Sequence, residues 1–229
     1  MPERDTLSMS SEPDAHDRQA HAGIYLMAAH PDWRNSRVLH RLLTAARAMA
    51  ITEGMPTLDI HDLYHSYPDY SIDVAAEQER IANAKMVVLM HPIQWYSMPA
   101  LQKLWIDEVL TYGWAYGAVS TGTGDNSSAP ANAPGTALRG KKLWLVATTS
   151  AAQDDANAVT EQDAGAPFLP PYREIANVCG MTFLPPLVLH NAQSAGQEQV
   201  KTHIELFKKK LAYYGRAACG LSDTPPPVL

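Results

Sequence analysis

The chain has 229 residues, the size of one ample α/β domain or at most two small ones. Its net charge of −6 argues against nucleic acid or an anionic membrane surface as a partner, because both need concentrated positive charge. The two cysteines, Cys179 and Cys219, make neither a disulfide framework nor a metal site, which suits a reducing cytoplasm. No apolar run approaches the length of a membrane span, so no direct membrane insertion is expected.

The first 22 residues are polar and charged and lack the apolar core of a signal peptide. We expect them to form a disordered leader on a cytoplasmic protein. One flavodoxin-like domain is expected over residues 23–216, with residues 118–135 as an inserted loop rich in Gly, Ser, Ala, Asn and Pro. Residues 217–229 are expected to be a C-terminal tail.

Strands and helices alternate along the domain. Short apolar runs predict strands over residues 24–29, 57–62, 86–90, 142–148 and 183–189. Amphipathic patterns predict helices that begin near Ser36, at Asp73 and at Pro99, and helices over residues 172–179 and 197–214. This alternation implies an α/β fold with a parallel sheet and right-handed crossovers, for which the order 2-1-3-4-5 is one of two common solutions.

The most informative stretch is residues 86–117. An uninterrupted apolar run up to Met90 has the length and β-branched content of a strand buried on both faces. Pro92 then ends the ladder, and the loop over residues 92–97 carries polar and aromatic side chains before Pro99 opens the next helix. In an open α/β sheet, such a loop lies in the ligand crevice outside the carboxyl ends of the strands. A planar, apolar ligand with a hydrogen-bonding edge fits this loop, and a flavin has these properties.

Over residues 24–214 the chain resembles the NAD(P)H:quinone oxidoreductase (DT-diaphorase-like) flavoproteins. The resemblance is densest in the letters HPIQWYSMPALQKLWIDEVL and GWAYG, and it is closest to the bacterial ancillary subunits of glutathione-gated potassium-efflux systems. It implies a flavodoxin-like fold, that is, a five-stranded parallel sheet of order 2-1-3-4-5 with helices on both faces. It also implies FMN as the cofactor (FAD as the alternative), NAD(P)H as co-substrate, a homodimer, and a potassium-efflux membrane protein as a candidate partner.

The first predicted flavin segment reads AAHPDWRNSRVLHRLL and begins at Ala28. A strand ends there and a helix begins near Ser36, and a helix N-terminus offers free N–H groups and partial positive charge to a phosphate. The resemblance places the flavin phosphate at five positions, namely His30, Ser36, Arg37, Val38 and Leu39. Leu39 departs from the family pattern, which has Asn there, and the remaining charge is expected from Arg37 or Arg34.

The second segment is the loop after the third strand. The resemblance implies that its residues wrap the edge of the isoalloxazine ring, largely through backbone groups; they are Pro92, Ile93, Gln94, Trp95 and Tyr96. An isolated tryptophan is more often a core residue, so Trp95 has a structural alternative.

The third segment follows the fourth strand and reads ATTSAAQDD from Ala147. The family pattern TTGG lets the chain approach the flavin pyrimidine closely. Here Thr148 and Thr149 are kept, while Ser150 and Ala151 replace the glycines, so a positive φ at either position would be costly. The Tyr and His that assist hydride transfer in mammalian-type relatives correspond to Ala156 and Gln162, so no catalytic residue is predicted.

Two aromatic residues in the GWAYG segment, Trp114 and Tyr116, are candidates for the substrate pocket. In the resembling family this loop lies at the dimer interface and lends an aromatic ring to the partner's site. Structural packing alone is the alternative, and it is about equally favoured for Trp114. The loop histidines His61, His65 and His190 follow no metal-ligand pattern, so no metal is predicted.

The expected reaction is a two-electron, ping-pong hydride transfer from NAD(P)H through FMN to a quinone or similar acceptor. One alternative is a regulatory ancillary subunit of a potassium-efflux channel whose reductase activity is incidental. Another is an FMN-dependent azo- or nitroreductase, which the same chemistry permits. A flavodoxin-type electron carrier is disfavoured, because the Thr/Ser/Gly-rich phosphate loop of those proteins is missing from this sequence.

Overall fold

The computed structural model describes residues 23–117, 135–150 and 166–221. The predicted leader, all but the last residue of the predicted insertion 118–135, and residues 222–229 of the predicted tail therefore lie outside the described residues. Ala151, Ala156 and Gln162 lie outside them as well. Among the described residues, no helix has the length and apolar character needed to cross a membrane.

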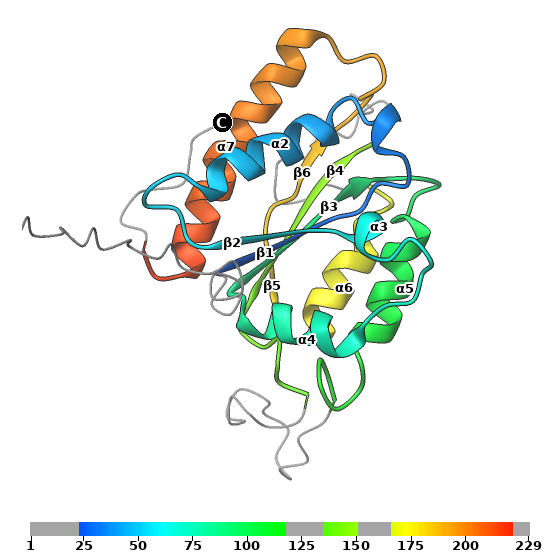
Figure 1. Ribbon diagram of the computed structural model, residues 1–229, viewed down its shortest axis with the longest axis vertical. Helices are drawn as coiled ribbons and strands as arrows, with labels where there is room; N and C mark the ends of the chain where they lie inside the picture. Colours follow the sequence, from blue (N-terminus) through cyan, green and yellow to red (C-terminus); the bar gives the residue numbers. More distant parts are fainter. Residues whose placement is uncertain (1–22, 118–134, 151–165, 222–229) are drawn as a thin grey trace, which may run out of the picture.

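One parallel sheet forms the centre of the domain (Figure 1). Its strands are β1 (Ile24–Ala28), β2 (Leu58–Asp62), β3 (Met86–Pro92), β4 (Lys142–Thr148), β5 (Thr182–Phe183) and β6 (Leu187–Leu189). The spatial order is β2-β1-β3-β4-β5, with β6 also paired to β4, so the predicted order is confirmed. The predicted strand over 183–189 is instead two short strands on the same edge of β4. Pro185 and Pro186 lie between them, and neither has an N–H to donate to the ladder.

Helices cover both faces of the sheet, as predicted (Figure 1). One face carries α2 (Leu39–Ala50) and α7 (Gln197–Ala218), and the other carries α4 (Val74–Asn83), α5 (Ala100–Val109) and α6 (Pro170–Val178). Two short elements were not predicted, namely the 3-10 turn η1 (Trp33–Asn35) and the single turn α3 (Leu63–Ser66). Asp73 caps α4 as predicted, because its carboxylate accepts from the N–H of Ala76 at 3.0 Å.

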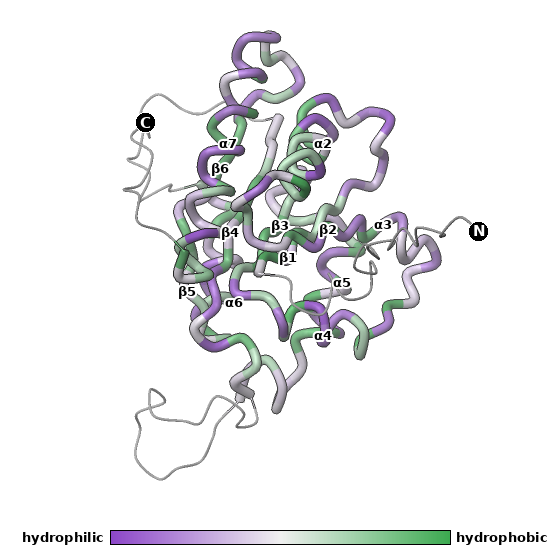
Figure 2. Tube along the Cα trace, turned by 60° about the vertical axis from the view of Figure 1, so that its left-hand side comes forward, coloured by the Kyte–Doolittle hydropathy of each residue, from purple (hydrophilic) through white to green (hydrophobic). Residues whose placement is uncertain are grey.

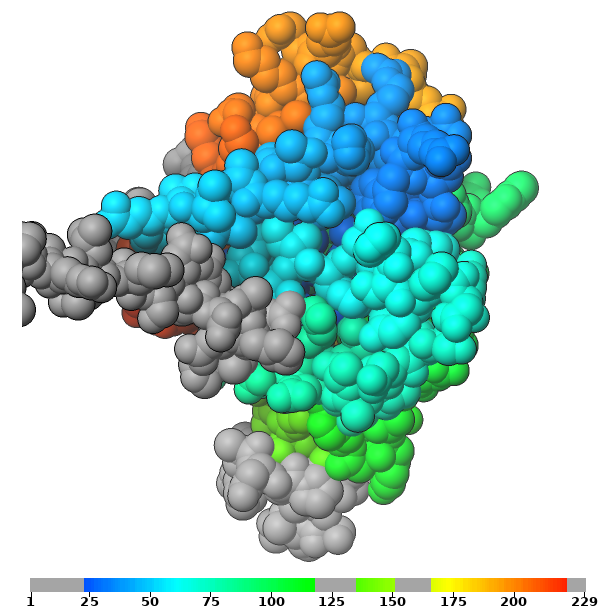
Figure 3. All heavy atoms as spheres, viewed as in Figure 1, coloured from blue at the N-terminus to red at the C-terminus, as the bar shows by residue number. Residues whose placement is uncertain are grey.

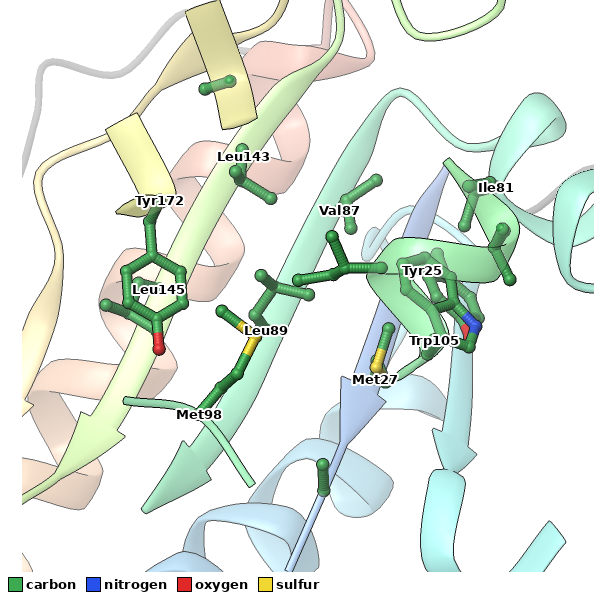
Figure 4. Packing of buried hydrophobic residues seen from close by; sticks show 14 of the residues in the cluster. Tyr25, Met27, Ile81, Val87, Leu89, Met98, Trp105, Leu143, Leu145 and Tyr172 are labelled. Atoms are coloured by element: carbon green, nitrogen blue, oxygen red, sulfur yellow. The ribbon is translucent and has the colours of Figure 1, made fainter. Parts of the chain in front are cut away.

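Each face of the sheet has its own apolar core, because successive residues of a strand point to opposite faces. In β3, Val87 and Leu89 face the core under α4, α5 and α6, while Val88 and Met90 face the core under α2 and α7. Figure 4 shows the first core, with Trp105 and Tyr172 packed over side chains of the strands. In Figure 2 the hydrophilic colour lies mainly on the outer loops and helices, which agrees with this division.

A buried carboxylate ties four elements of the first core together. Glu77 of α4 is fully buried and accepts hydrogen bonds from Tyr25 at 2.7 Å, Trp105 at 2.8 Å and Tyr67 at 2.9 Å. Nε2 of His61 lies 3.1 Å from the same carboxylate. Burial alone would raise the pKa of Glu77, but these contacts outweigh burial and lower the pKa to about 2. Glu77 is therefore ionised at neutral pH.

Candidate functional site

Three loops meet at the carboxyl edge of the sheet, which lies at the upper right in Figure 1. They follow β1, β3 and β4, which are neighbours in the sheet. Backbone hydrogen bonds join them, since the N–H of Ala29 donates to Met90 at 2.9 Å and the N–H of Ile93 donates to Thr148 at 2.7 Å. The three segments singled out in the sequence are thus brought together where open α/β sheets bind ligands.

The loop after β1 leads into the N-terminus of α2. The helix begins at Leu39 and not near Ser36, because the 3-10 turn η1 takes up residues 33–35 first. Ser36 still satisfies one first-turn group, since its Oγ accepts from the N–H of His40 at 3.2 Å. The N–H groups of Arg37, Val38 and Leu39 donate to no acceptor in the described part of the chain. Three free N–H groups at the start of a twelve-residue helix fit a phosphate.

The side chains of this segment point elsewhere. Val38 and Leu39 are buried in the core under α2, so they could contact a ligand only through their N–H groups. The guanidinium of Arg37 donates to the carbonyl oxygens of Gln193 and Ala195, after β6. These hydrogen bonds tie the Arg37 side chain to the loop after β6 but leave its positive charge in place, so a contribution of Arg37 or Arg34 to the charge at the phosphate stays a prediction.

His30 remains a candidate donor in the same loop. Its Nδ1 accepts from the N–H of Asp32 at 3.0 Å, and its ring packs 5.2 Å from the ring of Trp33. Partial burial lowers the pKa of His30 below its ordinary value, so the imidazole is neutral at pH 7. A neutral ring whose Nδ1 accepts carries its hydrogen on Nε2, which can donate to an anion.

The loop after β3 is a tight turn that presents two aromatic residues. Gln94 and Ser97 exchange backbone hydrogen bonds of 2.9 and 3.0 Å across it. Trp95 and Tyr96 both have positive φ, 47° and 62°, as in the type I′ turns that normally take Asn and Gly. Their side chains are 95% and 66% exposed, and the loop protrudes on the right of Figure 3. The core alternative for Trp95 is therefore wrong.

The backbone of this turn is also open to a ligand. Within the described residues, the N–H groups of Trp95 and Tyr96 have no acceptor. Ile93 differs from them, because its side chain is buried and its N–H donates to the carbonyl of Thr148 in β4. Bulky residues with positive φ are rare and costly, and such strain concentrates at ligand sites.

The loop after β4 is fixed to its neighbours up to Thr149. The N–H of Thr149 donates to Leu189 at 3.0 Å, and its carbonyl accepts from Ala192 at 3.0 Å. Both Thr148 and Thr149 are buried, whereas Ser150 is exposed. Ser150 is not among the residues with positive φ, so replacing the glycine there brings no left-handed strain. The N–H of Ser150 has no acceptor among the described residues and can face the same ligand.

The structure does not bring Trp114 and Tyr116 to this edge. Their turn follows α5 and lies beside residues 135–141, which lead into the amino end of β4. The carbonyl of Trp114 accepts from the N–H of Ala137 at 3.2 Å, and both aromatic rings are half-buried against the first core. Within one chain they cannot line the crevice, so a role in the pocket requires a second subunit and stays a prediction.

Sequence reasoning missed two residues beside the crevice. His91 stands between the predicted end of β3 and the loop, and the structure extends β3 through it to Pro92. Trp33 covers His30, in a turn that the sequence pattern did not resolve. The only available signal for His91 was a polar residue directly after an apolar run, which usually marks the end of a strand.

The donor set of the three loops fits a flavin mononucleotide. The N–H groups at the start of α2 suit a phosphate, and those of Trp95, Tyr96 and Ser150 suit the polar edge of a ring system. The exposed rings of Trp95 and Tyr96 offer flat apolar surfaces beside it.

Comparisons with known proteins agree with this fold. A sequence model of the flavodoxin-like fold matches residues 23–212. The glutathione-regulated potassium-efflux system ancillary protein KefF of Salmonella typhi is 35% identical over 188 residues, which cover 82% of this chain and 94% of that protein. The solved structure of general stress protein 14 from Treponema denticola, in complex with FMN, is 31% identical with a TM-score of 0.66 and covers 83% of this chain and 98% of that one.

A third similar structure is that of a quinone reductase, named as a candidate of that class, from Klebsiella pneumoniae. It is 23% identical with a TM-score of 0.63 and covers 89% of this chain and 86% of its own. At that identity the likeness shows the fold alone.

Proposed function

Because this chain belongs to the flavodoxin-like fold family, we propose that it is a flavoprotein that transfers two electrons from NAD(P)H to a quinone or a similar electrophile. The observation that carries the proposal is the meeting of three loops whose free N–H groups match a phosphate at one place and a polar ring edge at another. The FMN complex of the relative from Treponema denticola supports FMN over FAD.

The residues of this chain would bind and orient the cofactor. The N–H groups of Arg37, Val38 and Leu39 would hold the phosphate, with Ser36 and His30 beside it. The turn at Trp95 and Tyr96 and the N–H of Ser150 would hold the ring edge. When bound, FMN supplies the redox chemistry by accepting a hydride from NAD(P)H and passing two electrons to the second substrate.

The aromatic rings favour a flat electron acceptor. Trp95 and Tyr96 are exposed beside the proposed ring site, where they would cover the plane of a quinone and exclude water from it. No side chain of the described residues is assigned a proton-transfer role. A homodimer in the cytoplasm, with each pocket completed by the partner's 112–117 turn, is part of the proposal.

The reaction is tested with protein loaded with FMN and supplied with NADH or NADPH. We expect oxidation of at least one nucleotide with a benzoquinone as acceptor, at a higher kcat/KM than with an azo dye or a nitroaromatic. Protein that binds FMN but oxidises neither nucleotide would contradict the proposed reaction. Faster turnover of the azo dye would favour the azoreductase alternative.

A second role is favoured by one specific finding, the 35% identity to an ancillary protein of a potassium-efflux system over 94% of that protein's length. We propose that this chain also docks on a potassium-efflux membrane protein as a regulatory subunit, and that its reductase activity is incidental to this role. Co-purification with such a protein from the same organism is the expected result. Failure to co-purify from membranes that contain the efflux protein would remove this role and leave the reductase proposal standing.

A further inference from the structure

His91 is a fully buried imidazole at the edge of the crevice. It is the second-last residue of β3 and lies opposite Ala147 of β4. Its ring stacks on the ring of Tyr172, with 5.6 Å between the centroids and 22° between the planes. Tyr172 belongs to the first turn of α6, so the imidazole is held between the end of β3 and the start of that helix.

Among the described residues, the imidazole of His91 makes one hydrogen bond, which goes to a residue just before the aromatic turn. Nδ1 lies 2.9 Å from the carbonyl oxygen of Pro92. That oxygen can only accept, so Nδ1 carries the hydrogen and donates. Burial lowers the pKa of His91 to about 4, although this hydrogen bond acts in the opposite direction, and the ring is neutral at pH 7.

This bond fixes one end of a peptide group whose other end is already fixed. The peptide that joins Pro92 to Ile93 has its N–H bound to Thr148 of β4 at 2.7 Å, and its carbonyl is bound to His91. The residue after Ile93 is Gln94, which opens the turn that holds Trp95 and Tyr96 at positive φ. The plane of this peptide therefore sets the direction in which the turn leaves the sheet.

Burial of the His91 imidazole lowers the stability of the folded protein in a way that burial of an apolar side chain would not. Nε2 of His91 is buried and has no hydrogen-bond partner among the described residues. Buried polar atoms without a partner are uncommon in folded proteins and call for a physical reason. A residue such as the neighbouring Leu89 would fill the same layer without that cost, so what histidine adds here is the donor to Pro92.

We propose that His91 is a positioning residue for the flavin loop: it fixes the peptide between Pro92 and Ile93 and thereby holds the Trp95–Tyr96 turn in its binding conformation before a ligand arrives. The ligand of this turn rests on the proposed function. The geometry of the loop does not, and it can be measured without any flavin.

The test uses two variants of His91 and one matched control. His91→Phe keeps an aromatic ring to stack on Tyr172 but loses the donor, whereas His91→Asn keeps an N–H near the position of Nδ1. His203→Phe is the control. Like His91, His203 is buried, its Nε2 has no hydrogen-bond partner within the described ranges, and burial lowers its pKa to about 4. It lies on α7, over the other face of the sheet. Amide hydrogen exchange of Ile93, Gln94 and Ser97, whose N–H groups are hydrogen-bonded, is measured in flavin-free protein. FMN affinity is measured by quenching of flavin fluorescence.

We expect His91→Phe to speed exchange in the turn and to weaken FMN binding about tenfold, the equivalent of one hydrogen bond of about 1.4 kcal/mol. His91→Asn should restore both to within about threefold of the wild type, and His203→Phe should change neither. Three outcomes would overturn the inference. They are unchanged hydrogen exchange in His91→Phe, failure of His91→Phe to fold, and equal effects of His91→Phe and His91→Asn on exchange and FMN affinity. A wild-type protein that binds no flavin would refute the proposed function, while the exchange measurement would still decide the role of His91.

Discussion

At the scale of single residues, Trp95 and Tyr96 are the most informative positions in the chain. Both adopt positive φ, which costs a bulky residue roughly 1–3 kcal/mol, and neither ring recovers that cost by packing on the core. These two side chains lower the stability of the free protein, so we expect that ligand binding accounts for their presence in the turn. Stability and ligand binding are therefore expected to respond in opposite directions to substitution here.

The double variant Trp95→Asn with Tyr96→Gly tests this opposition, because Asn and Gly are the residues that a type I′ turn prefers. We expect the flavin-free protein to gain about 1 kcal/mol or more in its free energy of unfolding, and FMN binding to weaken at least about tenfold. Urea unfolding and FMN titration measure the two effects. Ile51→Asn, at an exposed apolar residue after α2, serves as the control and should change neither. A loss of stability in the double variant, equal with and without FMN, would contradict the ligand role of these rings.

At the scale of elements, Glu77 connects α4 with β1, β2 and α5 through one buried carboxylate. Its pKa of about 2 lies below the ordinary value of 4.5. A lowered pKa means that the stabilisation is fully present above the ordinary value and is lost as the pH falls toward 2. At about 1.4 kcal/mol for each unit, the shift corresponds to roughly 3 kcal/mol.

Glu77→Gln should therefore lower the free energy of unfolding by roughly 3 kcal/mol at pH 7. The difference from the wild type should narrow at pH 3, where the wild type has lost part of the same contribution. Urea unfolding at both pH values measures this difference in the free energy of unfolding. Glu79→Gln on the same helix serves as the control. A difference that is the same at pH 7 and pH 3 would contradict the assignment of the lowered pKa to Glu77.

Much of the arrangement of elements could be predicted from the sequence, because apolar runs and alternation specify a parallel sheet directly. The exceptions are local. The edge strand is divided at Pro185 and Pro186, and α2 starts late because η1 precedes it. The two prolines were a visible signal against one continuous strand over residues 183–189. The late start of α2 had no such signal, because the sequence pattern did not indicate the turn that precedes it.

The loops of the candidate site could be predicted from their place after β1, β3 and β4, but their side-chain directions could not. Arg37 turns to carbonyl groups more than 150 residues away, at Gln193 and Ala195. His91 is buried because α6, which begins near residue 170, places Tyr172 against it. Both outcomes depend on tertiary contacts, which a local sequence pattern does not contain.

At the scale of the whole molecule, the two groups of aromatic residues lie at opposite edges of the sheet. The crevice has Trp95 and Tyr96, while the 112–117 turn has Trp114 and Tyr116, together with Tyr112, which is 71% exposed. A single chain cannot bring the two groups together. If the second group contributes to the pocket, the contribution comes from another copy in a two-fold arrangement.

Trp114→Glu places a charge in that turn and should dissociate the proposed dimer, because an unpaired charge is strongly disfavoured in an apolar interface. Light scattering measures the mass, and turnover with a quinone measures activity. We expect a monomer with activity lowered at least about tenfold, even where FMN remains bound. A fully active monomer would contradict both the interface and the shared pocket.

The central claim is that the carboxyl-edge loops bind a flavin, and the most direct test is the flavin content of the purified protein. We expect a yellow protein whose absorbance corresponds to about one non-covalent flavin per chain. The flavin should appear in the supernatant after denaturation and run as FMN on chromatography. A colourless protein that also takes up neither FMN nor FAD when they are added would contradict the account.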